Sequence, residues 1–202
     1  MPKVVGITGG IATGKSTVLG MLADLGARTL SADDLAREVL AKGTPGYAET
    51  VERFGQAILA PDGQIDRRAL AGIVFADAEA RQTLNDITHP RIIAAMRRRI
   101  DSFRAHPPDP NAVLAVEIPL LVECGLAGTV DEVLVVVAEP RTQVSRLTRR
   151  YGMTDEDARR RLAAQMPMEC KIERADRVIT NEGSSEDLAD SVRAVWDQIH
   201  LL

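Results

Sequence analysis

Val4-Val5-Gly6-Ile7-Thr8-Gly9-Gly10-Ile11-Ala12-Thr13-Gly14-Lys15-Ser16-Thr17 runs near the start of the chain. Its first five residues are a short apolar run, which predicts a buried strand. Residues 9–16 match G-x-x-x-x-G-K-[ST], and the spacing of Val18, Met21 and Leu22 predicts a helix directly afterwards. In this order the three parts form a phosphate-binding loop, because backbone N–H groups and the positive end of a helix dipole converge on one anion. The alternative is a chance glycine-rich turn.

Each part of this loop has a chemical task. The glycines let the backbone turn tightly and approach a ligand with no Cβ in the way. Lys15 is placed to reach the outer phosphates of a nucleoside triphosphate, and the Ser16 hydroxyl to ligate Mg²⁺. The residues that we expect to bind the nucleotide here are Gly10, Ile11, Ala12, Thr13, Gly14, Lys15, Ser16 and Thr17.

Composition limits the class of protein. A chain of 202 residues suits one domain with insertions, and 45% hydrophobic and 27% charged residues are ordinary for a globular protein. The net charge of −4 weighs against a nucleic-acid-binding footprint. Cys124 and Cys170 lack C-x-x-C spacing, which argues against zinc and against a disulfide scaffold. No apolar run approaches the roughly 20 residues of a membrane span, so we expect a cytoplasmic protein.

Four further short runs predict strands, at residues 27–30, 112–117, 131–138 and 176–180. The run at 131–138 is continuous and β-branched, which suits a parallel sheet covered on both faces. Helical patterns separate the strands. The predicted fold class is therefore α/β, a three-layer P-loop NTPase with a parallel five-stranded sheet, a helical substrate-binding insertion and a helical lid.

Asp33 follows the second predicted strand. In doubly wound sheets, ligands lie outside the carboxyl ends of the strands. Asp33 is therefore a candidate for contacting the acceptor hydroxyl. The alternative is an N-cap of the helix that follows, a position that Asp favours; Asp34 could instead serve as the cap and leave Asp33 free.

A long, mostly helical insertion follows, over residues 33–109. Its size suits a subdomain that holds the substrate. His89 is a candidate substrate contact, with a capping or packing role as the alternative. Pro90 predicts the start of a helix at that point, and the polar, proline-rich residues 103–111 predict a linker.

Glu117 ends the apolar run that begins at residue 112. An acid at the end of such a strand is what a phosphate-loop enzyme uses to hold Mg²⁺, directly or through water. The alternative is a strand-end carboxylate without a special role.

An arginine-rich helical pair occupies residues 141–173. Arg146 and Arg150 are four residues apart and so share one helix face, and Arg161 lies in the second helix. As a mobile lid, the pair would bring guanidinium groups onto transferring phosphates and exclude water. One alternative is a solvated surface whose arginines are balanced by its own acidic residues. Another is an RNA-binding face, although these helices have almost no aromatic residues among the arginines.

Several motifs occur together in an order that resembles the dephospho-coenzyme A kinase family. They are Gly6 to Thr17, Ala32-Asp33, His89-Pro90, Pro119-Leu120-Leu121-Val122-Glu123, Gln143 with Arg146 and Arg150, Arg161-Leu162 with Gln165, Ala175-Asp176 with Val178-Ile179, and Asn181-Glu182-Gly183. The resemblance spans nearly the whole chain. The sequence departs from the family pattern at Ser31 and Glu117, where the family more often has Asp, and at Ala12 and Thr13, where Gly and Ser are common.

The resemblance implies that ATP phosphorylates the ribose 3′-hydroxyl of dephospho-CoA, giving CoA and ADP in the last step of coenzyme A synthesis. It implies a core over residues 1–32, 110–140 and 174–202, an acceptor domain over 33–109 and a lid over 141–173. It also implies a monomer or weak homo-oligomer, with neither nucleic acid nor membrane as a partner.

The same resemblance implies a role for each candidate residue. Asp33 is the expected general base, with Lys15 and Arg146 as the other catalytic residues. Arg150 and Arg161 would contact ATP, and Ser16 and Glu117 would lie at Mg²⁺. The expected acceptor-binding residues are Thr8, Asp33, His89, Pro119, Leu120, Leu121 and Glu123.

Two rival functions have weaker support in the sequence. Another small-molecule kinase would share the phosphate loop, but the adenylate-kinase loop G-x-P-G-x-G-K-G is absent from the sequence. A nucleotide switch that reads guanine would need N-K-x-D, and none of Asn85, Asn111 and Asn181 begins one. A pure interaction module would not need an intact Lys15-Ser16 pair.

Overall fold

The computed structural model describes residues 1–201. Its contacts divide the chain into two compact units, one of residues 1–30 with the chain from 102 onwards, and one of residues 31–101. The sequence placed the insertion at 33–109, and the difference at its end arises because a long helix continues across that boundary. The predicted lid falls within the first unit, and its separate movement stays a prediction.

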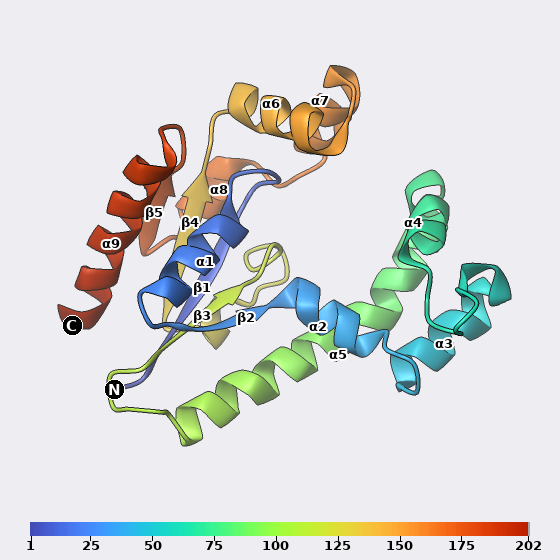
Figure 1. Ribbon diagram of the computed structural model, residues 1–202, viewed down its shortest axis with the longest axis horizontal. Helices are drawn as coiled ribbons and strands as arrows, with labels where there is room; N and C mark the ends of the chain where they lie inside the picture. Colours follow the sequence, from blue (N-terminus) through green and yellow to red (C-terminus); the bar gives the residue numbers. More distant parts are fainter. Residues whose placement is uncertain (202) are drawn as a thin grey trace. The chain divides into compact units, whose positions relative to one another are not determined.

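The first unit is built on a five-stranded sheet in the order β2-β3-β1-β4-β5 (Figure 1). The strands are β1 (Lys3–Gly9), β2 (Arg28–Ser31), β3 (Val113–Glu117), β4 (Glu132–Val137) and β5 (Arg177–Thr180). β1 runs parallel to both of its neighbours, β3 and β4, and β4 runs parallel to β5. The α/β fold class with a five-stranded sheet is confirmed. Its central strand leads directly into the glycine-rich loop, so the loop lies between the ends of β3 and β4.

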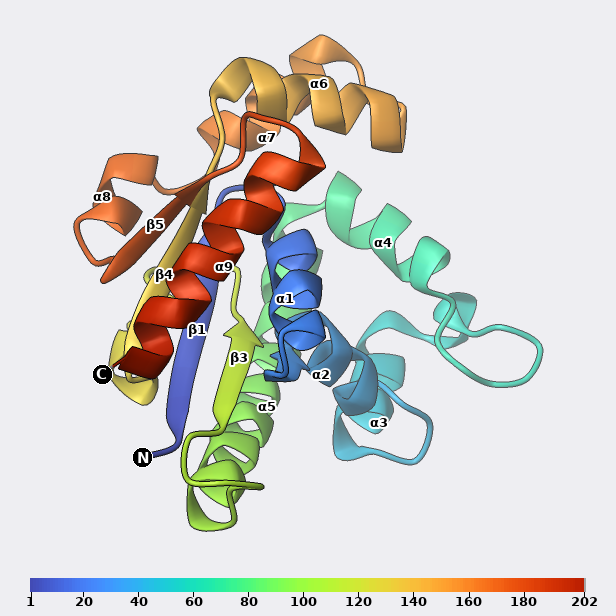
Figure 2. The same ribbon diagram turned by 60° about the vertical axis from the view of Figure 1, so that its left-hand side comes forward.

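Two helices cover one face of this sheet, α1 (Lys15–Asp24) and α9 (Ser185–Leu201) (Figure 2). Val5 and Ile7 of β1 point to this side, because alternate residues of a strand face opposite ways. They share a core with Val18 and Leu22 of α1. Trp196 packs against the same core, which agrees with its expected role there rather than at a ligand.

The other face of β1 is covered by the segment 118–131 and by α8 (Met168–Ile172). Gly6 faces this side, and a Cβ on it would lie 2.5 Å from Leu121 Cδ1. Glycine therefore lets the segment approach the strand closely. Thr8, the next residue of β1 on this face, is fully buried beneath the same segment.

The short η2 (Ala127–Thr129) belongs to the segment that leads into β4. The two remaining helices, α6 (Pro140–Tyr151) and α7 (Asp155–Ala163), follow the carboxyl end of β4. Val144 and Leu147 of α6 pack on Ala158 of α7, and Ile11 and Ala12 of the glycine-rich loop pack against this cluster. The arginine-rich pair is therefore in direct contact with the loop.

The second unit is helical. Its elements are α2 (Ala32–Val39), α3 (Pro45–Phe54), η1 (Gln56–Ile58), α4 (Arg67–Ala76) and most of α5 (Ala78–Ala105). Arg91 of α5 forms an ion pair with Glu49 of α3, with Nη2 and Oε2 2.6 Å apart. The Tyr47 hydroxyl donates to Gly63 O at 2.5 Å and closes the turn between η1 and α4.

The prediction that Pro90 begins a helix is wrong, because α5 continues through Pro90 without interruption. A proline inside a helix removes one N–H donor and crowds the preceding turn. The carbonyl that loses its helical donor here is that of Asp86, four residues before Pro90. Arg91 Nη1 donates separately to Ile87 O at 2.5 Å. The same helix extends to Ala105, so residues 103–105 belong to α5 and the linker begins only after them.

None of the helices within residues 1–201 has both the length and the apolar character needed to cross a membrane.

Candidate active site

The loop between β1 and α1 adopts the tight path that its glycines predict. Gly9 and Gly14 have φ of 146° and 99°, values that side chains with a Cβ rarely adopt. A Cβ on Gly9 would lie 2.2 Å from Val136 O, and one on Gly14 would lie 2.2 Å from Asn181 Nδ2. Both positions therefore require glycine for space as well as for conformation.

Three side chains from elsewhere in the chain hold the carbonyl groups of this loop. Gln143 Nε2 donates to Ile11 O at 2.6 Å, Arg146 Nη1 to Ala12 O at 3.1 Å, and Asn181 Nδ2 to Thr13 O at 2.7 Å. In a trans peptide the N–H points away from the carbonyl of the same unit. These bonds therefore turn the amide groups of residues 12 and 14 to the opposite side of the loop, where a phosphate can accept from them. The Thr13 N–H between them donates to Gly10 O at 3.5 Å.

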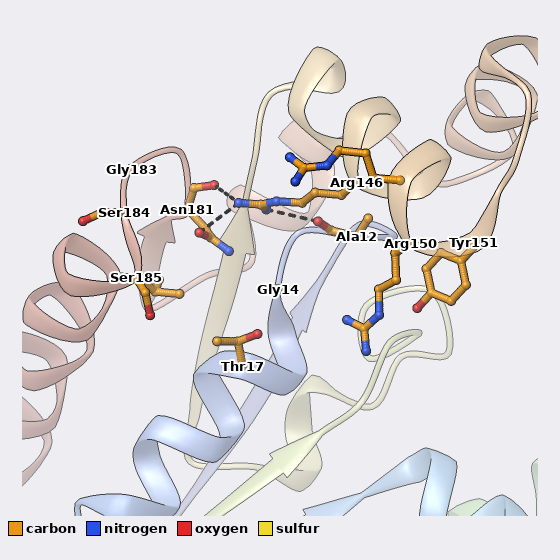
Figure 3. Close-up of a pocket in the computed structure, with 12 residues that line it drawn as sticks. Ala12, Gly14, Thr17, Arg146, Arg150, Tyr151, Asn181, Gly183, Ser184 and Ser185 are labelled. Atoms are coloured by element: carbon orange, nitrogen blue, oxygen red, sulfur yellow. Dashed lines mark hydrogen bonds between the residues drawn. The ribbon is translucent and has the colours of Figure 1, made fainter.

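Arg146 is the central member of this network (Figure 3). Its Nη2 donates to Asn181 O at 2.9 Å and to Asn181 Oδ1 at 3.1 Å, while Nη1 reaches the loop. The planar guanidinium is suited to several acceptors at once. Arg146 thus joins α6, the loop and the residue that follows β5.

Sequence reasoning did not assign positioning roles to Gln143 and Asn181. Both are buried, with 6% and 7% of their surface exposed. The available signal was the position of each polar side chain, Gln143 within a helix and Asn181 directly after a strand. A polar group that is buried at such a position is normally hydrogen-bonded. Their partners became evident only in the folded chain.

The lid also contacts a backbone N–H of the loop. Gln165, which follows α7, accepts a hydrogen bond of 2.9 Å from the Ile11 N–H. With Gln143 on Ile11 O, both polar groups of this residue are bound by glutamine side chains of the predicted lid.

Lys15 and Ser16 lie where α1 begins. Lys15 Nζ donates to Gly10 O at 2.7 Å, so the ammonium folds back over the loop. Ser16 Oγ donates to Glu117 Oε1 at 3.1 Å. Glu117 is 6% exposed at the end of β3. A hydroxyl and a carboxylate oxygen side by side are hard oxygen donors of the kind that Mg²⁺ prefers, so this pair fits a magnesium site.

A cavity of about 560 Å³ opens beside the loop. Figure 3 shows Arg150 and Tyr151 at the end of α6 on one side of it, and Ser184 and Ser185 on the other. Both sides belong to the first unit. Its volume is in the range of small-molecule sites.

Glu182 fastens the start of α6 to the turn after β5. Its Oε2 accepts from Thr142 Oγ1 at 2.6 Å, and its Oε1 accepts from the Glu139 N–H. Desolvation alone would raise the pKa of Glu182, but these hydrogen bonds, with Arg146 and Arg141, outweigh it and lower the pKa. A carboxylate is also favoured at this helix end, because the helix dipole is positive there.

Ala12 has φ of 57°, in the left-handed region, and no other non-glycine residue within residues 1–201 has a positive φ. This costs alanine about 1–2 kcal/mol. Glycine would avoid the cost but would lose about 0.5–1 kcal/mol of entropy on folding. We expect Ala12→Gly to raise the free energy of unfolding by up to about 1 kcal/mol, and Ala12→Val to lower it. Urea unfolding at equilibrium measures both free energies. A less stable Ala12→Gly variant would contradict the inference that the Ala12 backbone is strained.

The predicted acceptor loop, residues 119–123, differs in exposure along its length. Leu120 is 41% exposed, whereas Leu121 is fully buried in the core. Pro119 O accepts from Thr8 Oγ1 at 3.1 Å. Glu123 Oε1 lies 2.5 Å from Lys171 Nζ in an ion pair. In this conformation Leu120 is the member that presents its side chain to solvent.

Asp33 does not cap α2. The N-cap is Ser31, whose Oγ accepts from the Asp33 N–H at 3.2 Å. Asp34 pairs instead with Arg37 at 2.9 Å. The alternative cap role for either Asp is therefore wrong, because the serine that replaces the usual family Asp supplies the cap. The Asp33 side chain is exposed.

His89 is half-buried on α5, within the second unit, as Asp33 is. Arg161 is half-buried on α7. The other arginines of α7 behave as a solvated surface: Arg160 is exposed and pairs with Asp157 at 2.8 Å. Within the arginine-rich pair, Arg146 of α6 faces the phosphate loop, whereas Arg160 of α7 lies on a solvated surface.

Comparisons with known proteins agree on one family. A family model described as Dephospho-CoA kinase matches residues 3–187. A protein of Moorella thermoacetica named dephospho-CoA kinase is 46% identical over 97% of this chain and 92% of its own length. One from Geobacter metallireducens with the same name is 47% identical over 96% of each. A crystal structure of a Thermus thermophilus protein is 36% identical and covers 98% of this chain and 97% of its own, with a TM-score of 0.74.

Proposed function

The chain belongs to the dephospho-CoA kinase family, and from this premise we propose how its residues carry out the reaction. The enzyme is a kinase that phosphorylates dephospho-CoA with ATP, in the last step of coenzyme A synthesis. One observation carries the residue assignment: Gln143, Arg146 and Asn181 hold the carbonyl groups of the phosphate loop, so that the amides of residues 12 and 14 face outward.

The ATP phosphates bind in this loop. The backbone N–H groups from Ala12 to Thr17 donate hydrogen bonds to the phosphate oxygens, and Lys15 leaves Gly10 O to reach the outer phosphates. The nucleoside end occupies the cavity beside the loop, where Arg150 is placed to contact it. Arg161 contacts the phosphates from the lid when the lid closes.

Asp33 acts as the general base. It orients the ribose 3′-hydroxyl and takes its proton as the oxygen attacks the γ-phosphorus of ATP, and ADP leaves. Its carboxylate is exposed and is not used as a helix cap, which leaves it available for this role. The other residues that we assign to the acceptor are His89, Thr8 and the loop that begins at Pro119.

Ser16 and Glu117 would hold Mg²⁺. The adjacent hydroxyl and buried carboxylate supply hard oxygen ligands. When bound there, the ion would neutralise charge on the phosphate oxygens of ATP.

Glu117→Gln removes one charged ligand but keeps the side chain's shape. We expect the Mg²⁺ concentration for half-maximal rate to rise about 10-fold or more. Glu186→Gln, an exposed acid in the first turn of α9, is the matched control and should leave that concentration unchanged. Titration of the initial rate with MgCl₂ measures both, and equal Mg²⁺ requirements would remove Glu117 from the metal site.

The second unit would carry the acceptor domain, and residues 141–173 a lid that closes on ATP. The protein would work in the cytoplasm, where its substrate ATP is abundant, as a monomer or weak homo-oligomer without nucleic acid. Light scattering over a concentration series tests the assembly state, and cell fractionation with an antibody tests the compartment.

The activity itself is tested by ADP release, coupled to NADH oxidation, with ATP and Mg²⁺. The acceptors are dephospho-CoA and a panel of AMP, CMP, adenosine and gluconate. We expect turnover with dephospho-CoA alone, with CoA identified as the product by mass spectrometry. Preference for another acceptor would overturn the substrate, and no acceptor-dependent turnover would overturn the kinase reaction.

A further inference from the structure

Lys171 of α8 is an unusual lysine, because its side chain is only 2% exposed. An ammonium group removed from water costs free energy unless it is paired and hydrogen-bonded. Its Nζ lies 2.5 Å from Glu123 Oε1 and 3.2 Å from Pro119 O. Both partners belong to one loop, so a single buried cation binds the two ends of residues 119–123.

The pair is not arranged for stability alone. Glu123 Oε2 is buried and has no hydrogen-bond partner among residues 1–201. A buried carboxylate oxygen without a donor is costly, and apolar residues often replace a buried ion pair without loss of stability. Stability therefore does not account for the second contact of Lys171, its hydrogen bond to Pro119 O.

Pro119 O accepts two hydrogen bonds. One comes from Lys171 Nζ, and the other comes from Thr8 Oγ1 at 3.1 Å. Thr8 is fully buried and is the penultimate residue of β1, directly before the phosphate loop. The carbonyl thus joins α8 to the end of the central strand. Pro119 itself lies two residues after Glu117 of the proposed magnesium site.

We propose that Lys171 is a positioning residue for the acceptor. Its ammonium holds Pro119 O, and with it the loop, against the end of β1, so that the exposed Leu120 is presented to dephospho-CoA. Glu123 is the counter-ion of Lys171 and does not bind the acceptor directly, in contrast to the role expected from the sequence. This inference rests on the proposed function, because it assigns this loop to the acceptor.

The test separates positioning from stability with a single and a double variant. Lys171→Met leaves Glu123 buried without its partner, so we expect a lower unfolding midpoint and a raised KM for dephospho-CoA. In Lys171→Met with Glu123→Leu, both charges are gone and the midpoint should recover toward that of the parent. Pro119 O still lacks the Lys171 donor and keeps only the hydrogen bond from Thr8 Oγ1. The KM for dephospho-CoA should therefore stay raised about 10-fold or more, and the KM for ATP should change less than about 2-fold.

Lys42→Met is the matched control, because Lys42 is an exposed lysine that bonds Asp62 O in the other unit. It should change neither KM. Hydrogen exchange across residues 118–126, measured without substrate, should be faster in the double variant than in the parent.

A stable double variant with the parent's KM for dephospho-CoA and the parent's exchange would overturn the inference and leave Lys171 a structural residue. Failure of the proposed function has a different signature, since the parent itself would then show no turnover with dephospho-CoA. In that case the exchange rates decide whether Lys171 holds the loop, and equal rates overturn it.

Discussion

Asp33→Asn is expected to lower kcat by about 10²–10⁴-fold while the KM for ATP stays close to that of the parent. The amide keeps the size of the carboxylate but cannot take the proton of the attacking hydroxyl. Folding should be unaffected, because Ser31 and not Asp33 caps α2 and the Asp33 side chain is exposed. Steady-state kinetics with each substrate varied in turn measures the effect.

Asp34→Asn is the matched control for this variant. Asp34 is the next residue of the same helix turn and is equally a carboxylate, but it pairs with Arg37 in an exposed ion pair. Such pairs contribute little to stability, so its kcat should remain within about 2-fold of the parent's. If Asp33→Asn retained full turnover with an unchanged pH–rate profile, Asp33 would not be the base.

Arg146→Ala is expected to lower kcat/KM by about 10³–10⁵-fold, the range for an arginine that stabilises a transferring phosphoryl group. Two losses contribute. The positive charge near the phosphates disappears, and Ala12 O and Asn181 lose the donor that helps to orient the loop. Single-turnover phosphorylation at saturating ATP measures the loss in the chemical step.

Companion variants separate the two losses. Arg146→Lys keeps the charge but cannot bridge the same acceptors, so an intermediate rate would mean that both matter. Arg159→Ala removes an exposed arginine of α7 whose closest acid, Asp155, is 3.7 Å away, and it should retain the parent's rate. A rate for Arg146→Ala within about 10-fold of the parent's would exclude the proposed role.

Most of the sheet could be predicted from the sequence because its signals are local. A run such as residues 131–138 is apolar enough to be a buried strand in any parallel sheet, and β4 spans Glu132–Val137. The glycine pattern of residues 9–14 likewise requires a tight turn before a helix, and Gly9 and Gly14 have the positive φ that only glycine adopts without strain.

Local signals failed where a neighbouring turn or side chain compensated for them. Pro90 is a helix breaker by itself, yet α5 continues through it because the turns on both sides of it supply the other backbone hydrogen bonds of the helix. Asp33 is a good cap by propensity, but the Ser31 hydroxyl lies closer to the start of α2 and takes the position.

By itself the sequence determined the α/β class, the phosphate loop with Lys15 and Ser16, and the family, because each depends on residues close together in the chain. Only the tertiary structure decided that Gln143, Arg146 and Asn181 orient the loop and that Lys171 holds Pro119 and Glu123. These contacts join residues 48 to 168 positions apart. A buried polar group must find its partner across the fold, and the sequence pattern around it does not say where that partner lies.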